Sequence, residues 1–544
     1  MKKNILISIV AILFSILIIL AFYSTLPIGG KYNNDDLANV APPIFNSQNN
    51  NWMFKSSFNE KYESYAFIPP GYLINKEKVL FPFGFIGLKL PLLVYYSVLN
   101  NEISYSIWQV LVYFLCVIVS FLISRIYLPL KKSIILAVLF AISPFLLSEL
   151  NIFFAEISIL FLLLLSVYFL IKSTSHQRKI YFVLSFFIYS YAVLIKISYA
   201  TLMPVYFIYL FFIIKNENKT YKVTIFKFIK YSVFLFLMFI IVLSPQFIQN
   251  KQTMGSYSSF SYLSYKNVYS GEIISTDGQL NAQLQDVKYL SLHRILNEYI
   301  KPNINESGQY VYVMNLRLLP FLLFLLAPSV IFFPLLYKDN NKKNYLRLTL
   351  LFFLFNFFIF GNLAGGFGFN DINIRASFVR YLYFGIGLIV IGSLMALLSY
   401  RHSSKKILII LLMTIIILNS LILTTKYPFT SYLWGDFKEK INNMGEDIIN
   451  LTEKDSVILS PGFDDGFLVG KREVFDYSYI PKEYQKAEIN KVVRKLEEDN
   501  IPTYIYYYNS PSIWGENHLF NFSENFNITM IKQFDRGYYL YKIN

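Results

Sequence analysis

The chain has 544 residues, of which 55% are hydrophobic and only 15% are charged, and its mean hydropathy is +0.44. This balance excludes an ordinary soluble protein and indicates an integral membrane protein. The formal charge of +15 does not indicate a nucleic-acid partner, because the lysines and arginines gather in short clusters between apolar runs.

The apolar runs predict about eleven membrane-spanning helices. A run of about 17–23 residues is long enough to cross a hydrocarbon core of about 30 Å as a helix. The outer-membrane barrel alternative would need short alternating segments, which these runs lack. The predicted spans are 4–26, 106–127, 133–149, 152–171, 180–196, 199–214, 223–244, 316–337, 345–363, 379–399 and 406–425.

The basic clusters predict the orientation of these spans. Lys2 and Lys3 precede the first run, and later clusters such as "KSTSHQRK" and "KDNNKKNYLR" fall in alternate loops. The positive-inside rule then places the N-terminus in the cytoplasm of a multi-pass plasma-membrane protein and the C-terminal segment outside. We take the first run as a retained anchor rather than a cleaved signal peptide.

Three long stretches interrupt the spans and are expected on the outer side: 27–104, 245–315 and 426–544. The first contains the semi-apolar piece 79–99, whose glycines and prolines oppose a spanning helix and whose Lys89 would be costly at mid-membrane. We expect an interfacial helix and turn there. A span at this piece would invert the side of everything that follows it.

The last stretch, 426–544, predicts a small extracytoplasmic α/β domain. Its pattern indicates helices near 436–452 and 483–500, three strands at 456–460, 472–478 and 503–508, and a closing hairpin. The expected fold class is therefore an α-helical polytopic membrane domain, 1–425, that includes outer loops 27–104 and 245–315, followed by the α/β domain.

Charged residues at the outer ends of the spans are the candidate site. They are Asp35, Asp36, Glu149, Glu156, Lys196, Arg375 and Arg380. A transporter needs polar groups near the bilayer midplane, whereas an enzyme acting on a lipid head group needs them at one interface. The distribution favours the enzyme over a transporter and over a receptor or scaffold.

Transfer of a sugar from a lipid phosphate suits such a set. The incoming hydroxyl must lose its proton to a carboxylate, which Asp35 or Asp36 could supply. The departing phosphate gains negative charge and needs a cation, such as Lys196, Arg375, Arg380 or a divalent metal held by carboxylates.

Several stretches resemble one family. The paired acids in "NDDLANVA", the interfacial "FPFGFIGLKLPL", and the later "SPFLLSELNIFFAE", "YAVLIKISYATLMPVYFI", "LSPQFIQNKQTMGSY" and "FVRYLYFGIG" occur in the order found in GT-C glycosyltransferases. These membrane enzymes, which include protein mannosyltransferases and aminoarabinose transferases, use polyprenyl-phosphate-linked sugars. The resemblance covers roughly residues 1–400, and a small outer α/β domain is common in the family.

The resemblance implies roles for individual residues. The first acid of the loop pair, Asp35, is the expected base for direct, inverting attack, and Asp36 and Glu156 are the expected supporting or metal-binding acids. From its position, Glu149 is a further candidate for that role. The cofactor is left unknown, with a divalent metal, Mg²⁺ or Mn²⁺, as the candidate. The expected partners are the polyprenyl-phosphate sugar, a glycan, lipid or protein acceptor, and membrane lipids. Two departures are visible: the peptide-binding "WWDYG" signature is absent, and Leu37 replaces the usual aromatic residue, which leaves the choice between Asp35 and Asp36 open.

Other interpretations of the same residues stay open. Asp35 and Asp36 could begin a helix as capping acids, and Lys196, Arg375 and Arg380 could be anchors whose charges reach the head groups. The alternative functions are a non-catalytic protein that binds lipid-linked glycans, and a polysaccharide transporter or polymerase.

Overall fold

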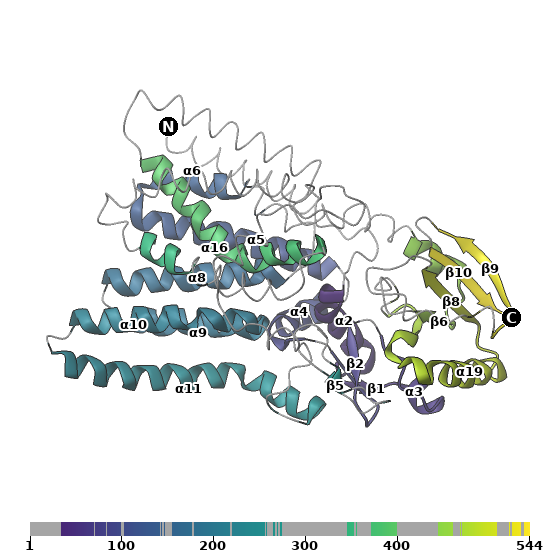
Figure 1. Ribbon diagram of the computed structural model, residues 1–544. Helices are drawn as coiled ribbons and strands as arrows, with labels where there is room; N and C mark the ends of the chain where they lie inside the picture. Colours follow the sequence, from purple (N-terminus) through teal and green to yellow (C-terminus); the bar gives the residue numbers. More distant parts are fainter. Residues whose placement is uncertain are drawn as a thin grey trace, which may run out of the picture. The chain divides into compact units, whose positions relative to one another are not determined.

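The computed structural model describes eleven main stretches and several short pieces of the chain (Figure 1). The main stretches are 34–99 without 70 and 83, 103–141, 155–176, 179–217, 220–255, 345–352, 372–399, 444–460, 470–508, 525–534 and 538–544. Their residues form two compact units, one from 109–245 with 345–399 and one from 34–108 with 246–274 and 444–544.

The first unit is helical. Its helices are α5 (Ile103–Tyr127), α6 (Leu130–Ala141), α8 (Ala155–His176), α9 (Lys179–Ile195), the 3₁₀ helix η2 (Ile197–Leu202), α10 (Met203–Glu217), α11 (Tyr221–Met254) and α16 (Ile372–Ser399). Within the residues that the structure describes, four stretches are long and apolar enough to cross a membrane: Ile107–Tyr127, Ala155–Ser173, Ile197–Lys215 and Tyr221–Thr253. These stretches match predicted spans. The predicted spans 4–26, 316–337 and 406–425 lie outside the described residues.

Hydroxyl groups join the helices α8, α9 and α10 inside the first unit. Ser166 Oγ and Ser185 Oγ each donate to the other residue's carbonyl oxygen at 2.7 Å, and Tyr206 OH lies 2.6 Å from Ser166 Oγ. Figure 1 shows these helices running side by side, with α11 alongside them. Small hydroxyl side chains allow the helices to approach closely, and their polar atoms form hydrogen bonds with each other where no water is present.

The second unit begins with α2 (Asn34–Asn49), which starts at the acid pair, as expected from the alternative interpretation of these acids as the beginning of a helix. A three-stranded antiparallel sheet follows in the order β1 (Phe54–Lys55), β3 (Val79–Pro82), β2 (Tyr72–Ile74), with the short helix α3 (Ser57–Lys61) between its strands. The helix α4 (Ile86–Leu99) comes next. At 14 residues it is shorter than a span requires, so the piece 79–99 is a strand and a short helix, and Gly87 and Pro91 lie inside that helix.

The C-terminal segment forms a five-stranded sheet in the order β7 (Glu473–Asp476), β6 (Val457–Ser460), β8 (Thr503–Tyr508), β10 (Tyr538–Ile543), β9 (Ile528–Gln533). The first three strands are parallel, and β10 pairs antiparallel with both of its neighbours. The helix α19 (Lys482–Glu498) packs on one face of the sheet, and the helix at 444–451 packs on the other. The predicted helices and strands of this segment are present here.

One core joins the first outer loop to this sheet. Tyr62, Ala66 and Phe67 are at most 1% exposed and belong to the same apolar cluster as α19 and the strands β6 and β7. The rings of Phe67 and Phe475 lie 5.1 Å apart. Segments separated by about 400 residues therefore fold together, which their sequence patterns do not predict.

Candidate functional site

The acid pair lies in the first turn of α2. Asp35 and Asp36 follow Asn34 at the start of the helix, while their side chains lie outside the described residues. Further along the helix, Val40 and Ala41 are completely buried, and the Val40 carbonyl accepts a hydrogen bond from Tyr105 OH at 2.8 Å. Helix α2 also packs against α4. The helix that carries both candidate bases is therefore held by two neighbouring elements.

Lys89 lies on α4 and is completely buried. Its neighbours along the helix, Ile86, Leu88 and Leu92, are buried apolar residues. Because burial disfavours the charged ammonium, the pKa of Lys89 falls to about 7. A buried lysine needs an anion or a set of acceptors near it, and Lys89 has an interaction partner within the chain.

A buried polar stripe on α11 lies against the start of α4. Gln246, Gln249, Asn250 and Thr253 share one face of the helix through their i, i+3, i+4, i+7 spacing, and each is at most 9% exposed. Gln246 Oε1 accepts the Ile86 backbone N–H at 2.9 Å, and Gln246 Nε2 donates to Asn250 Oδ1 at 2.9 Å. The first turn of a helix has free N–H groups, so Gln246 stabilises the start of the helix that carries Lys89.

Gln249 adds an unused acceptor to this stripe. Its Oε1 atom is buried and has no hydrogen-bond partner among the described residues. A buried amide oxygen without a donor costs about 1–3 kcal/mol.

In the first unit, Glu156 and Lys196 form a buried ion pair. Lys196 Nζ donates to Glu156 Oε1 at 2.9 Å, and the two side chains are 14% and 1% exposed. Glu156 is in the first turn of α8, and Lys196 has an extended backbone between α9 and η2. The sequence named both residues as site candidates, and the structure brings them together.

The turn that carries Lys196 is fixed by Tyr189. Tyr189 OH donates to the carbonyl oxygens of Tyr199 and Ala200 at 3.0 and 3.1 Å, and its ring stacks on Tyr206 at 4.3 Å. These contacts tie η2 to α9 and α10. The Lys196 ammonium is therefore presented by a rigid hairpin, as the sequence position between two spans predicts.

The remaining candidates stay predictions. Glu149 lies outside the described residues, and Arg375 and Arg380 lie on α16 with side chains that are not described. Among the side chains that the structure does describe, no three of His, Cys, Asp and Glu gather as a metal ion requires. Glu156 uses Oε1 to accept from Lys196, and the side chains of the other candidate acids are not described, so the metal stays a prediction and we derive no step through it.

Two features of the site were missed from the sequence as functional residues. Lys89 opposes a span in the apolar piece 79–99, and a lone lysine in such a piece is also a signal of function. The polar stripe from Gln246 to Thr253 was visible as a helical spacing of amides just beyond an apolar run. Both features surround the start of α4.

Comparisons with known proteins identify the fold. No family model and no curated protein matches the chain. Two solved structures of ArnT, the aminoarabinose transferase from Cupriavidus metallidurans, cover 98% of this chain and 98% of their own. The apo structure has a TM-score of 0.56 at 8% identity, and the structure bound to undecaprenyl phosphate has 0.54 at 9%.

The archaeal oligosaccharyltransferase AglB from Archaeoglobus fulgidus also matches, with a TM-score of 0.47 at 13% identity over 91% of this chain and 69% of its own. At such low identities these likenesses concern the fold alone. The ArnT structures confirm the resemblance found in the sequence: the chain has the GT-C fold of membrane glycosyltransferases.

Proposed function

We propose that this protein is a membrane glycosyltransferase that moves a sugar from a polyprenyl-phosphate donor to an acceptor at the outer face of the plasma membrane. The observation that carries the proposal is the packing of α2, which holds Asp35 and Asp36, against α4, which holds the buried Lys89. Candidate bases and a phosphate-binding cation thus lie on adjacent elements. The GT-C fold, shared with an ArnT structure solved with undecaprenyl phosphate, supports this donor class.

The mechanism would be a direct displacement. Asp35 or Asp36 accepts the proton of the acceptor hydroxyl as its oxygen attacks the anomeric carbon. The bond from that carbon to the phosphate oxygen breaks, the configuration inverts, and polyprenyl phosphate leaves. A cation meets the charge that develops on the phosphate. We assign this role to Lys89, and Lys196, Arg375 and Arg380 stay the candidates that the sequence names for it.

The shared core supports the proposal that the three long stretches lie on one side of the membrane. The first outer loop and the C-terminal segment pack in one cluster, and Tyr269 of the second loop contacts both of them. Segments that share a core must lie on the same side of a bilayer. This grouping supports the predicted topology, with the N-terminus in the cytoplasm and all three stretches outside.

The test compares polyprenyl-phosphate release by the wild type and the Asp35→Asn and Asp36→Asn variants. Purified protein is incubated with native membrane lipid extract, and the lipids are identified by mass spectrometry. We expect the wild type to release free polyprenyl phosphate and at least one variant to lose about 100-fold or more in rate, because a general base contributes about 10²–10⁴-fold. Glu60→Gln, which removes an exposed acid of the same unit, is the control.

Full activity in both Asp variants would refute the assigned base. The same membrane extract also supplies the acceptor. If the wild type then retains the lipid-linked sugar intact, a non-catalytic binder is favoured. A protein that holds no polyprenyl lipid would favour the transporter alternative.

A further inference from the structure

The C-terminal segment reaches the helix that carries the acid pair. Gly470, in the connection between β6 and β7, has a φ of +66°, and a Cβ added to it would lie 2.9 Å from Ile44 Cγ2 and 3.2 Å from Gln48 Nε2 of α2. A contact under 3.0 Å forces Ile44 or the turn to shift, so glycine is the residue that fits this approach without a displacement. The turn therefore lies directly against the second half of α2.

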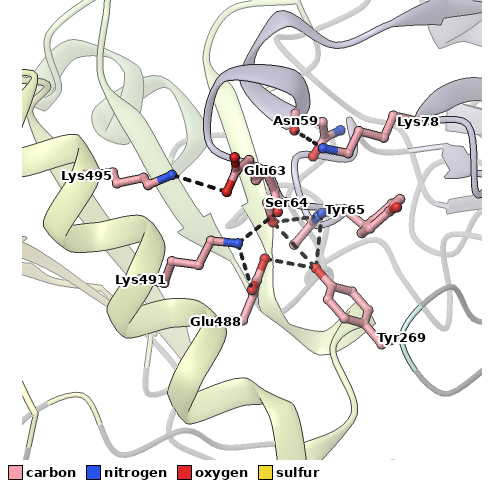
Figure 2. A network of polar contacts seen from close by, with 10 residues as sticks. Asn59, Glu63, Ser64, Tyr65, Lys78, Tyr269, Glu488, Lys491 and Lys495 are labelled. Atoms are coloured by element: carbon pink, nitrogen blue, oxygen red, sulfur yellow. Dashed lines mark hydrogen bonds and ion pairs between the residues drawn. The ribbon is translucent and has the colours of Figure 1, made fainter.

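The chain that follows α2 is held by the same segment. Figure 2 shows Tyr269 OH between the Tyr65 backbone N–H, at 3.1 Å, and Glu488 Oε1, at 3.4 Å. Beside it, Lys491 Nζ of α19 donates to the Glu63 carbonyl oxygen at 2.8 Å. Burial raises the pKa of Tyr269, so its hydroxyl stays protonated and can donate to the carboxylate.

A second set of contacts acts on the same loop. Tyr62 OH donates to Asp499 Oδ2 at 2.8 Å, and Lys61 Nζ lies 2.9 Å from the same oxygen. With Phe67 inside the core under α19, the loop at 56–68 has little freedom. Helix α2 thus contacts Gly470 in its second half, and the loop that follows the helix is anchored to the C-terminal segment.

We propose that the C-terminal domain positions α2, and that the Gly470 turn is the contact through which it does so. This inference rests on the proposed function: the domain would position the catalytic base, Asp35 or Asp36, without touching the substrate. A base misplaced by about 1 Å can cost about 100-fold in rate. A rigid contact that fixes the position of α2 therefore matters for the rate of transfer.

The test uses two glycines with the same backbone strain. Gly470 and Gly255 have φ values of +66° and +75°, but a Cβ at Gly255 meets nothing within 4 Å. The variants Gly470→Ala and Gly255→Ala are compared in the full chain by hydrogen exchange of residues 34–49 and by steady-state kinetics. We expect Gly470→Ala to speed exchange in α2 by about 10-fold or more and to lower kcat with KM for the lipid donor unchanged, while Gly255→Ala does neither.

A rescue separates contact from strain. Ile44→Leu removes the branch at Cβ and conserves volume, so Gly470→Ala should recover slow exchange and kcat in that background. Equal behaviour of the two alanine variants, or failure of the rescue, would overturn the inference. The exchange measurement does not depend on activity. A wild type without activity would therefore refute the proposed function, while the exchange rates would still show whether Gly470 positions α2.

Discussion

The charge of Lys89 changes with pH near neutrality. Its pKa in the folded chain is about 7, against an ordinary value of 10.5, because it is buried on α4, which is outside the candidate spans. Between these values the free protein has lost the proton, and a bound phosphate would restore it. We expect donor binding to take up a proton between about pH 7 and pH 10, and affinity to fall as pH rises through this window, by up to about tenfold per unit.

Calorimetry in buffers of different ionisation enthalpy measures this proton uptake. Lys89→Met should bind polyprenyl phosphate more weakly and without the uptake. The stability of the donor-free protein has the opposite sign: the unfolded chain binds the extra proton in this window, so the free energy of unfolding rises with pH. An uptake that persists in Lys89→Met would assign it to another group.

The Glu156 and Lys196 pair makes a second prediction at the residue scale. Glu156→Gln leaves the Lys196 ammonium buried without its counter-charge, which should lower the free energy of unfolding by about 3–5 kcal/mol. The double variant with Lys196→Met should recover much of this loss, because no charge stays buried. The exposed pair of Lys55 and Glu60, separated by 3.7 Å, is the control and should contribute at most about 1 kcal/mol. Thermal unfolding in detergent measures all of these variants.

Among the elements, the loop at 56–68 depends on one buried amide. Asn59 Nδ2 donates to the Phe67 carbonyl oxygen at 2.8 Å, its Oδ1 accepts the Phe67 N–H at 3.0 Å, and the residue is fully buried. Asn59→Ala leaves both backbone groups without partners, so it should cost about 2–4 kcal/mol. Asn49→Ala, which removes an exposed amide, should cost little. A small loss in Asn59→Ala would mean that water replaces the amide.

The elements also show what sequence alone can predict. The start of α2, the ends of α19 and the strands from β6 to β10 follow from local signals, namely capping acids and apolar periodicity. Lys196 was placed correctly because a charge between two apolar runs can only lie at their ends. The contacts of Gly470 with Ile44, and of Phe67 with Phe475, have no local signal, since each joins residues about 400 positions apart.

On the scale of the whole molecule, chain order and folding units differ. The sequence suggests a C-terminal domain that begins after the last span, with the outer loops belonging to the membrane part. Among the described residues, the structure places 34–108, 246–274 and 444–544 in one compact unit. A composition shift marks where a chain leaves the membrane, but the partners of a core depend on tertiary packing.

This shared unit predicts that the C-terminal segment does not fold alone. Residues 434–544 without the first loop would expose the surface covered by Tyr62, Ala66 and Phe67, and each large side chain contributes about 1.5–3 kcal/mol on burial. A domain of this size has only about 5–15 kcal/mol in total. We expect the isolated segment to lack a cooperative thermal transition, and a fusion of 52–82 to 434–544 through a flexible linker to regain it. Phe67→Ala in the fusion should lower the midpoint of the transition. An isolated segment that unfolds cooperatively at the same midpoint as the fusion would show that the segment folds without the loop.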